Sequence, residues 1–133
     1  MRIVFADTSF YVASLSPRDV NHARAEAVGR GLRGRVVTTE YVLLEVATFF
    51  CVAPHRAVFL GLLQSLQNDP EATTVLASAD LWTREVALFA ERTDKDWSLT
   101  DCISFVVMHE RGITEALTAD HHFEQAGFVA LLK

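Results

Sequence analysis

Four acidic residues stand out because of the positions that they occupy along the chain. Asp7 directly follows the apolar run IVFA, and Asp120 follows EALTA. Asp101 comes after WSLT, where a helix should begin, and Glu45 lies inside the apolar stretch YVLLEVATFF. Carboxylate oxygens, with few cysteines or well-placed histidines beside them, favour Mg²⁺ or Mn²⁺. If the fold gathers these four residues, we expect a pocket that holds one such ion, or two ions about 4 Å apart as in enzymes that cleave phosphodiesters.

Glu45 is the acid that local structure explains least. Its neighbours three and four residues away on a helix are Tyr41, Val42, Thr48 and Phe49, and none of them is basic. The surrounding stretch has the composition of a buried helix, in which an unpaired carboxylate is strongly unfavourable. We therefore expect Glu45 to find a partner elsewhere or to line a polar pocket.

The other three acids each have an ordinary structural explanation as well. Asp7 suits an Asx-turn that leads into the next helix. The sequence Ser98-Leu-Thr-Asp101 is a capping-box pattern, in which the carboxylate also favours the positive end of the helix. Asp120 suits a turn. Each acid is therefore weak evidence when taken alone, and the metal hypothesis depends on their meeting.

Strands and helices alternate along almost the whole chain. We expect strands at residues 2–6, 35–39, 73–76, 115–118 and 128–131, helices at residues 9–15, 21–32, 54–67, 79–92 and 100–111, and one more around Glu45 that ends near residue 52. This alternation predicts an α/β fold with a central parallel sheet of four to five strands and helices on both faces. Ligands bind such sheets at the carboxyl ends of the strands, where Asp7 and Asp120 fall. We expect residues 1–133 to form one domain.

The composition limits the classes of function. Half of the 133 residues are apolar, the mean hydropathy is +0.21, and no apolar run is long enough to span a membrane. The net charge of −5 disfavours a protein that coats nucleic acid by charge and suits clustered carboxylates that meet a cation or a basic partner. Without a secretory signal we expect a cytoplasmic protein. Cys51 and Cys102 are expected to be small buried residues.

Four stretches of the chain resemble the PIN domain ribonucleases, and within them the VapC-type toxins of prokaryotic toxin–antitoxin systems. The stretches are IVFADTSF, TTEYVLLEV, DKDWSLTDCISFVVMHERGI and ALTADHHFEQAGFVALL, which together span nearly the whole chain. The resemblance implies a PIN-like three-layer sandwich. It places the family's four acidic positions on Asp7, Glu45, Asp101 and Asp120, and it makes hydroxyls near the first and third acids auxiliary candidates, namely Thr8, Ser9, Ser98 and Thr100.

The resemblance also implies a reaction and partners. PIN nucleases hydrolyse RNA phosphodiesters with Mg²⁺ or Mn²⁺ and leave a 5′-phosphate and a 3′-hydroxyl. Asp7 and Asp101 would be the main metal carboxylates, and Glu45 and Asp120 would complete the site. A VapC-type toxin implies a VapB-type antitoxin whose tail enters the acidic groove. A homodimer is also expected, and the apolar helix surface that includes Phe59 would serve either partner or belong to the core.

Other interpretations remain open at this point. A free-standing housekeeping PIN nuclease and a catalytically inactive PIN-fold binding module share the same residues. An aspartyl-phosphate phosphatase would need an acid two residues after Asp7, where Ser9 stands. A phospho-acceptor domain would need paired acids near the first strand and a suitably placed late lysine. For RNA contacts we consider the basic cluster Arg30, Arg33 and Arg35 and the loop residue Trp97, whereas Trp82 is expected in the core. We assign no role to His121 or His122.

Overall fold

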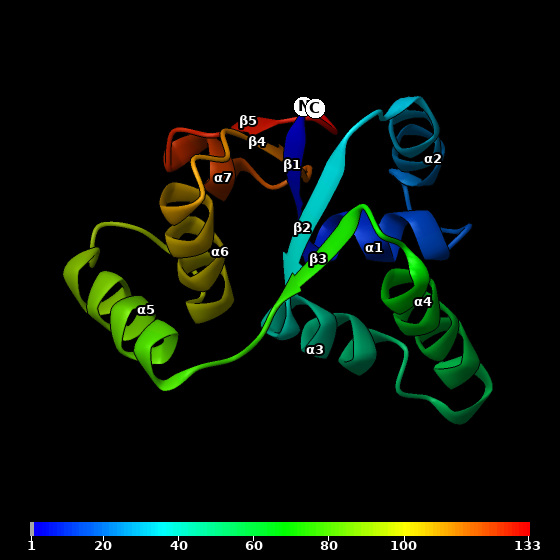
Figure 1. The fold of residues 1–133 in the computed structure, drawn as a ribbon, viewed down its shortest axis with the longest axis horizontal. Coiled ribbons are helices and arrows are strands. Elements are labelled where there is room, and N and C mark those ends of the chain that lie inside the picture. The colour runs from blue at the N-terminus through cyan, green and yellow to red at the C-terminus, as the bar shows by residue number, and fades with distance from the viewer. Residues whose placement is uncertain (1) are drawn as a thin grey trace.

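The central element of the fold is a sheet of five parallel strands. A computed structural model describes residues 2–133. The strands follow the order β3-β2-β1-β4-β5 across the sheet, and every neighbouring pair is parallel, as predicted (Figure 1). Their bounds are β1 Ile3–Ala6, β2 Arg35–Thr39, β3 Ala72–Val75, β4 Glu115–Leu117 and β5 Val129–Ala130.

The helices cover both faces of this sheet. In Figure 1, α5, α6 and α7 lie on one side of the sheet, whereas α1, α2 and α4 lie on the other, and α3 continues from the carboxyl end of β2. Their bounds are α1 Thr8–Leu15, α2 His22–Gly31, α3 Glu40–Phe49, α4 Arg56–Asn68, α5 Ala79–Glu91, α6 Leu99–Glu110 and α7 His121–Gln125, with a 3-10 turn η1 at Ala53–His55. This arrangement confirms the predicted α/β class.

The strand order indicates that a ligand would bind next to β1. The chain builds outward from β1 through β2 to β3, then crosses to the other side of β1 and builds β4 and β5. The order therefore reverses between β1 and β4, and the crevice at the carboxyl ends of such a pair is where open α/β sheets bind ligands. The backbone amide of Asp7 donates to the carbonyl of Leu117 at 3.2 Å, which ties these two strand ends together.

Polar side chains fix where several helices begin. Thr39 accepts a hydrogen bond from the amide of Val42 at the start of α3, and Ser78 accepts one from Leu81 at the start of α5. At α6, Ser98 and Asp101 form the predicted capping box in both directions. These caps determine the register in which each helix presents its side chains to the sheet.

The core is densest around α6. This helix is buried along most of its length, and Phe105 packs edge-on against both Trp97 and Phe123, at centroid distances of 4.9 and 5.0 Å. Phe5 of β1 lies beside Phe123 in the same cluster. Because α6 is held so firmly, its first turn is a rigid support for Asp101.

Several predictions about single residues were wrong. Cys51 is exposed because it follows the end of α3, whereas Cys102 is buried as expected. The two tryptophans exchange roles: Trp82 is 52% exposed on the outer face of α5, and Trp97 is 6% exposed, with its indole donating to Gln125 Oε1 at 3.1 Å. Trp97 therefore belongs to the core although its neighbours in the sequence are polar.

One glycine allows a close backbone approach. Gly34 has φ +146, and a Cβ built there would lie 2.2 Å from the carbonyl oxygen of Arg2. The same carbonyl accepts a hydrogen bond from Arg35 at 2.8 Å. Glycine at this position lets β2 begin in register beside β1.

Within residues 2–133, none of the helices has the length and apolar character that crossing a membrane would need.

Candidate metal centre

All four predicted acids line one open cleft at the carboxyl edge of the sheet. Its volume is about 470 Å³. Asp7 comes from the end of β1, Asp120 follows β4, Asp101 lies in the first turn of α6, and Glu45 lies on α3. Asp19 and Asp96, which sequence reasoning did not single out, bring the number of carboxylates in the cleft lining to six. Both lie in loops without a diagnostic spacing, so only the fold shows that they reach the cleft.

Asp7 is the most deeply held of these carboxylates, with 6% of its surface exposed. It makes no side-chain capping bond to α1, so the Asx-turn explanation is wrong. Its Oδ2 instead accepts hydrogen bonds from Thr118 Oγ1 at 2.9 Å and Ser9 Oγ at 3.0 Å. Burial raises the pKa of Asp7 to about 6, the charge of Asp101 acts in the same direction, and the two hydroxyls partly oppose both effects.

Thr118 links Asp7 to Asp120, and sequence reasoning did not identify it. It is fully buried, and its Oγ1 accepts a hydrogen bond from the amide of Asp120 at 3.0 Å while it donates to Asp7. Its position two residues before Asp120, at the end of β4, is the signal that could have identified it. Thr118 thus fixes the relative positions of the first and last acids.

Glu45 does not lie in the buried part of its helix. α3 buries Val42, Leu43 and Val46, while Glu45 is exposed toward the cleft. Its Oε1 accepts a hydrogen bond from Thr8 Oγ1 at 2.6 Å, across from the first residue of α1. The expected partner is therefore a hydroxyl and not a basic side chain, and no uncompensated buried charge is present at this position.

Asp101 combines the capping role with a place in the cleft. Its carboxylate accepts a hydrogen bond from the amide of Ser98 at 3.1 Å. Burial raises the pKa of Asp101, and the nearby charge of Asp120 raises it further. Thr100 is not among the residues that line the cleft, whereas Thr8, Ser9 and Ser98 are.

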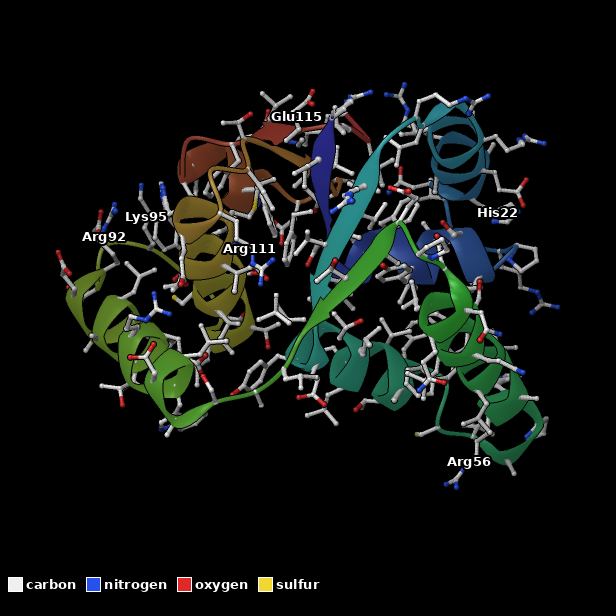
Figure 2. The ribbon with its side chains drawn as sticks, viewed as in Figure 1. His22, Arg56, Arg92, Lys95, Arg111 and Glu115 are labelled. Atoms are coloured by element: carbon white, nitrogen blue, oxygen red, sulfur yellow. The ribbon has the colours of Figure 1, made fainter. Side chains whose placement is uncertain are left out.

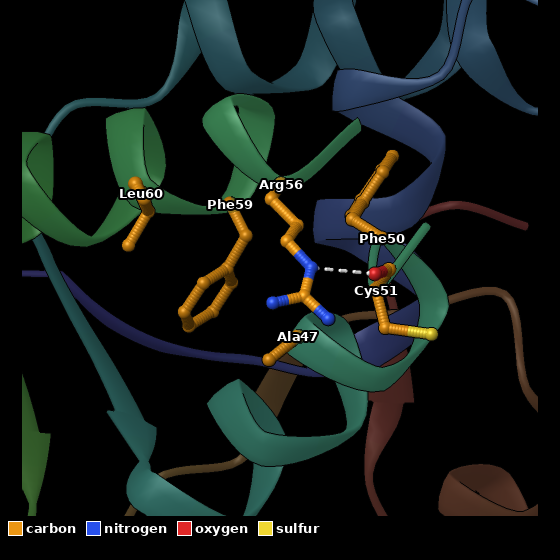
Figure 3. A pocket seen from close by; sticks show the side chains of 6 residues that line it. All are labelled: Ala47, Phe50, Cys51, Arg56, Phe59 and Leu60. Atoms are coloured by element: carbon orange, nitrogen blue, oxygen red, sulfur yellow. Dashed lines mark hydrogen bonds between the residues drawn. The ribbon is translucent and has the colours of Figure 1, made fainter. Parts of the chain in front are cut away.

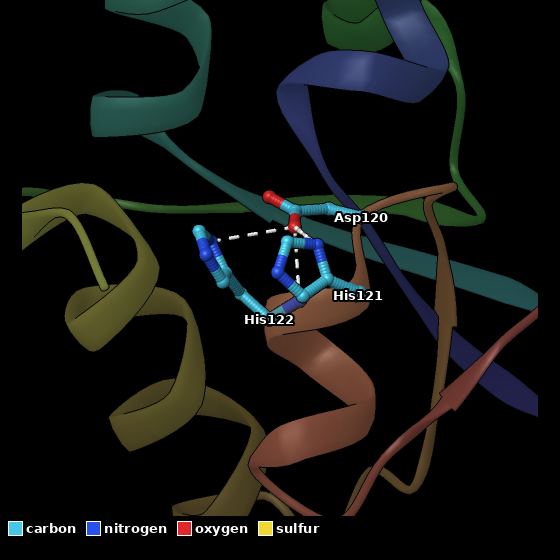
Figure 4. A group of neighbouring side chains, drawn as sticks. All are labelled: Asp120, His121 and His122. Carbon is cyan, nitrogen blue, oxygen red and sulfur yellow. Dashed lines mark hydrogen bonds and ion pairs between the residues drawn. The ribbon is translucent and has the colours of Figure 1, made fainter. Parts of the chain in front are cut away.

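Asp120 begins a short helix that sequence reasoning took for a turn. Its Oδ1 caps α7 by accepting a hydrogen bond from the amide of His122 at 2.9 Å. The ring nitrogen Nδ1 of His122 lies 3.2 Å from Asp101 Oδ2 and 3.3 Å from Asp120 Oδ1. In the part of the chain that the structure describes, one group of three metal-ligating side chains has donor atoms within 4.8 Å of one another, namely Asp120, His121 and His122 (Figure 4). The four acids line a wider space.

Basic side chains lie beside the cleft but not in it. Among residues 2–133, no lysine or arginine belongs to the cleft lining. A neighbouring hollow shares Asp96 with the cleft and includes Arg92 and Lys95 from the loop between α5 and α6 (Figure 2). Of the predicted basic cluster, Arg30 lies in the last turn of α2, and Arg33 and Arg35 lie where β2 begins, at the edge of the sheet opposite the cleft. Arg33 donates to the carbonyls of Arg30 and Leu32.

A second, apolar pocket lies between α3 and α4. It has a volume of about 240 Å³, and its lining comprises Ala47, Phe50, Cys51, Arg56, Phe59 and Leu60 (Figure 3). Arg56 crosses it and donates from Nε to the carbonyl of Cys51 at 2.7 Å. α4 has no fully buried residue, although its half-buried side chains, Phe59 among them, pack against the core. Of the two sequence-based alternatives for this surface, packing against the core is confirmed for Phe59, and contact with a partner stays a prediction.

The donor set of the acidic cleft fits a hard divalent cation. Six carboxylates without a lysine or arginine among them repel one another, and the raised pKa values of Asp7 and Asp101 express that repulsion together with burial. Mg²⁺ and Mn²⁺ prefer such oxygen ligands. Because Mg²⁺ keeps several waters, carboxylates spread over a wide cleft can reach it partly through water.

The chain is similar in sequence to one protein family and to proteins of known activity. Residues 4–129 match the PIN domain family. The 23S rRNA-specific endonuclease VapC20 of Mycobacterium tuberculosis, from strains CDC 1551 / Oshkosh and H37Rv, is 30% identical over 130 residues, which cover 96% of each chain.

Two solved structures show the same fold. The crystal structure of Mycobacterium tuberculosis VapC20, described as a sarcin-ricin loop cleaving toxin, has a TM-score of 0.86 at 25% identity and covers 95% of this chain and 96% of that one. The crystal structure of FitAcB from Neisseria gonorrhoeae has a TM-score of 0.66 at 16% identity, covers 96% of this chain and 94% of that one, and is a likeness of fold alone.

Proposed function

The chain belongs to the PIN domain family, as a homologue of VapC-type ribonuclease toxins, and on that premise we propose that its acidic cleft hydrolyses phosphodiester bonds of ribosomal RNA. PIN nucleases generally use a divalent metal ion, and we propose Mg²⁺ or Mn²⁺ here. The observation that carries the proposal is the meeting of Asp7, Glu45, Asp101 and Asp120 in one cleft from four separate elements.

Each acid has a distinct part in this proposal. Asp7 and Asp101 would hold the ion, because they are the two buried acids of the cleft and stand on well-packed elements, the end of β1 and the first turn of α6. Thr118 and Ser9 both bind Oδ2 of Asp7 and so orient its carboxylate. Glu45 and Asp120 would orient water for the attack on phosphorus. The bound ion would polarise the phosphate and lower the pKa of the attacking water.

The substrate part of the proposal rests on the relatives. The relatives from Mycobacterium tuberculosis are named as 23S rRNA-specific, and the matching region spans 96% of this chain. Phosphates of the RNA would approach an acidic cleft only with help from cations. Arg92 and Lys95 stand at its border, and Arg92 also lies over the ring of Trp97 at 4.8 Å. We assign the RNA contacts to this loop. A cytoplasmic location belongs to the same proposal, because ribosomal RNA is the substrate.

VapC toxins pair with an antitoxin, and two features suit such a partner here. A basic side chain of the antitoxin would meet the six carboxylates of the cleft. An apolar segment would lie in the pocket between α3 and α4, where Leu60 is 60% exposed and α4 has no fully buried residue. The two sites would together exclude RNA from the cleft.

A homodimer is the second partnership that we propose. Trp82, Val86 and Phe89 are exposed at intervals of four and three residues and form one stripe on α5, which we call the α5 stripe. A second copy that packs its own α5 stripe against this one would cover both. Residues 1–133 would form one domain in each subunit, since β1 and β5 belong to the same sheet.

The enzymatic claim is tested by cleavage of ribosomal RNA by the purified chain, with added Mg²⁺ or Mn²⁺ and with EDTA. We expect cleavage that EDTA abolishes, and a loss of about a hundredfold or more in Asp7→Asn and in Asp101→Asn. Variants that fold and cleave like the wild type would refute the mechanism. Specific products from 23S rRNA, as opposed to general degradation, would support the substrate assignment.

Expression in cells, together with the cleavage assay, distinguishes a toxin from a free-standing nuclease and from an inactive binding module. A toxin arrests growth when it is expressed alone, and the neighbouring open reading frame relieves the arrest. RNA cleavage in the test tube without growth arrest would favour a housekeeping nuclease. Absence of cleavage with intact RNA binding would favour the inactive module.

A further inference from the structure

We propose that Asp120, His121 and His122 form a binding site for a transition-metal ion, distinct in its preference from the all-carboxylate side of the cleft. Figure 4 shows both imidazole rings turned toward the Asp120 carboxylate. Asp120 Oδ1 lies 3.6 Å from His121 Nδ1 and 3.3 Å from His122 Nδ1. This metal site shares Asp120 with the proposed ribonuclease site and so rests in part on the proposed function. Metal binding is measured without RNA, so the metal site and the ribonuclease activity can each fail independently of the other.

These two spacings are close to those of donor atoms that share one ion, and all three donor atoms lie within 4.8 Å of one another. Ligand bonds to Zn²⁺-like ions are about 2.0–2.1 Å long, so two ligands on one ion lie about 3.0 Å apart at a right angle and about 3.4 Å apart at a tetrahedral angle. The separation between His122 Nδ1 and Asp120 Oδ1 is of this size, and the separation between His121 Nδ1 and Asp120 Oδ1 is slightly larger. The exposed His121 ring would therefore have to move toward the ion on binding.

Existing contacts hold two of the three ligands in place before any ion binds, Asp120 through backbone amides and His122 through carboxylates. Asp120 accepts a hydrogen bond from the amide of His122, and its own amide donates to Thr118 Oγ1. The side chain of His122 is 20% exposed, and its Nδ1 also lies 3.2 Å from Asp101 Oδ2, so the Asp101 carboxylate helps to hold the His122 ring in place. Only His121, with 62% of its side chain exposed, has to be ordered by the ion.

The donor types decide which ions the site selects. Imidazole nitrogen suits Zn²⁺, Co²⁺, Ni²⁺ and Cu²⁺, whereas Mg²⁺ prefers carboxylate and water oxygens. Asp7 and Glu45, on the other side of the cleft, offer oxygen alone. The cleft therefore has one side for hard ions and another for nitrogen-binding ions, joined through Asp101 and Asp120.

The competing explanation is that both histidines are protonated counter-ions of the carboxylates. In that case Asp120 and Asp101 would bind His122 by charge, and no ion would be needed. The two explanations differ in what happens when a nitrogen-binding metal is added. A ligand set loses metal affinity when an imidazole is removed, whereas a pair of counter-ions gains metal affinity because the cleft becomes more negative.

The test is a titration of the metal-free full chain with Co²⁺, followed by its visible absorption, and with Mg²⁺, followed by calorimetry. The variants are His121→Ala, His122→Ala and the double variant, with His55→Ala as the control because His55 is exposed in η1 outside the cleft. We expect Co²⁺ affinity to fall about tenfold or more in each single variant, Mg²⁺ affinity to stay within about twofold, and His55→Ala to bind both ions like the wild type.

Co²⁺ affinity that is unchanged or higher in the double variant would overturn the site and support the counter-ion explanation. His121→Ala keeps the test decisive if His122→Ala perturbs α7, because the His121 ring is exposed and contributes little to the core. RNA cleavage with Mg²⁺ in the double variant, measured separately, reports on the ribonuclease and not on this site.

Discussion

At the scale of single residues, Thr118 is the clearest case in which a buried hydroxyl serves the cleft. Thr118→Val keeps the shape but removes the hydrogen bond to Asp7 Oδ2 and the acceptor for the Asp120 amide. We expect a loss of about 1–3 kcal/mol in the free energy of unfolding, and about a tenfold loss in the rate of RNA cleavage.

Thr38→Val is the matched control for this prediction. Thr38 is similarly buried, but its hydroxyl donates to the backbone carbonyl of Ala6 at 2.9 Å, whereas that of Thr118 binds an acid of the cleft. We expect a similar loss of stability with normal cleavage. If both variants lose activity in proportion to stability, Thr118 has no specific role in the site.

Glu85 makes stability depend on pH. It is fully buried on the inner face of α5, and within residues 2–133 neither of its carboxylate oxygens has a hydrogen-bond partner. Burial raises the pKa of Glu85 to about 7 from the ordinary 4.5. Between these values the folded chain binds one proton more than the unfolded chain, so the free energy of unfolding falls as the pH rises from about 4.5 to 7 and then levels off.

Glu85→Gln should remove this dependence, because the amide has the same shape and no charge. The wild type should lose stability relative to the variant by up to about 1.4 kcal/mol per pH unit across the window, as measured by urea unfolding at several pH values. Parallel curves for the two proteins would show that Glu85 is ionised in the folded state or reached by water.

At the scale of elements, the α5 stripe is the surface that we propose for the homodimer, and the sequence did not indicate it. Trp82 was expected in the core but is half exposed, because α5 buries Leu81 and Glu85 against its neighbours and turns Trp82 outward. Trp82→Glu places a charge in the middle of the stripe. We expect the variant to be a folded monomer by light scattering at a concentration at which the wild type is a dimer.

Val20→Glu is the control, since Val20 is 95% exposed in the loop between α1 and α2 and lies outside the stripe. It should leave the dimer intact. A wild type that is monomeric at high concentration, or a Trp82→Glu variant that still dimerises, would contradict the role of α5.

Most elements could be predicted from the sequence because their signals are local. The apolar run of β1, the cap residue Ser98 and the alternation of strands and helices specify the parallel sheet and place Asp7 and Asp120 at one edge. α7 was missed because five residues are too few to show a helical period. The burial of Trp97 was missed because it depends on distant neighbours, Phe105 and Gln125.

The site itself could be predicted only in part, for the same reason. The four acids have positions that a sheet topology explains, whereas Asp19 and Asp96 reach the cleft through tertiary packing and no sequence spacing indicates them. Thr118 had a signal in its place before Asp120, but its hydrogen bond to Asp7 depends on the pairing of β1 with β4. Glu45 was expected to find a partner elsewhere or to line a polar pocket, and it does both: it lines the cleft and accepts a hydrogen bond from Thr8. The sequence could not identify Thr8 as the partner, because it lies on a different helix.

At the scale of the whole molecule, an acidic protein has to bind a polyanion. The net charge is −5, and six carboxylates line the cleft, so attraction for RNA has to come from bound cations and from the border formed by Arg92 and Lys95. Within residues 2–133, Lys95 makes no ion pair, whereas Arg92 pairs with Asp94. Lys95 is therefore the side chain most available to a phosphate.

Lys95→Ala should raise the KM for RNA about threefold to tenfold and leave kcat nearly unchanged. It should also reduce the slope of log(kcat/KM) against log salt concentration by about one. Arg33→Ala, which removes a charge at the opposite edge of the sheet, should change neither. Equal effects of the two substitutions would indicate a general charge effect and not an RNA contact at this loop.

The most direct test of the metal-dependent ribonuclease is the rate of RNA cleavage as a function of Mn²⁺ concentration, for the wild type, Glu45→Gln and Glu40→Gln. Both glutamates lie on α3 and both are exposed, but Glu40 accepts a hydrogen bond from Ala77 and does not line the cleft. We predict a saturable dependence on Mn²⁺ in the wild type and in Glu40→Gln, and a loss of about a hundredfold in Glu45→Gln with normal stability. A rate that is independent of Mn²⁺, or a Glu45→Gln variant as active as Glu40→Gln, would contradict the metal-dependent cleft.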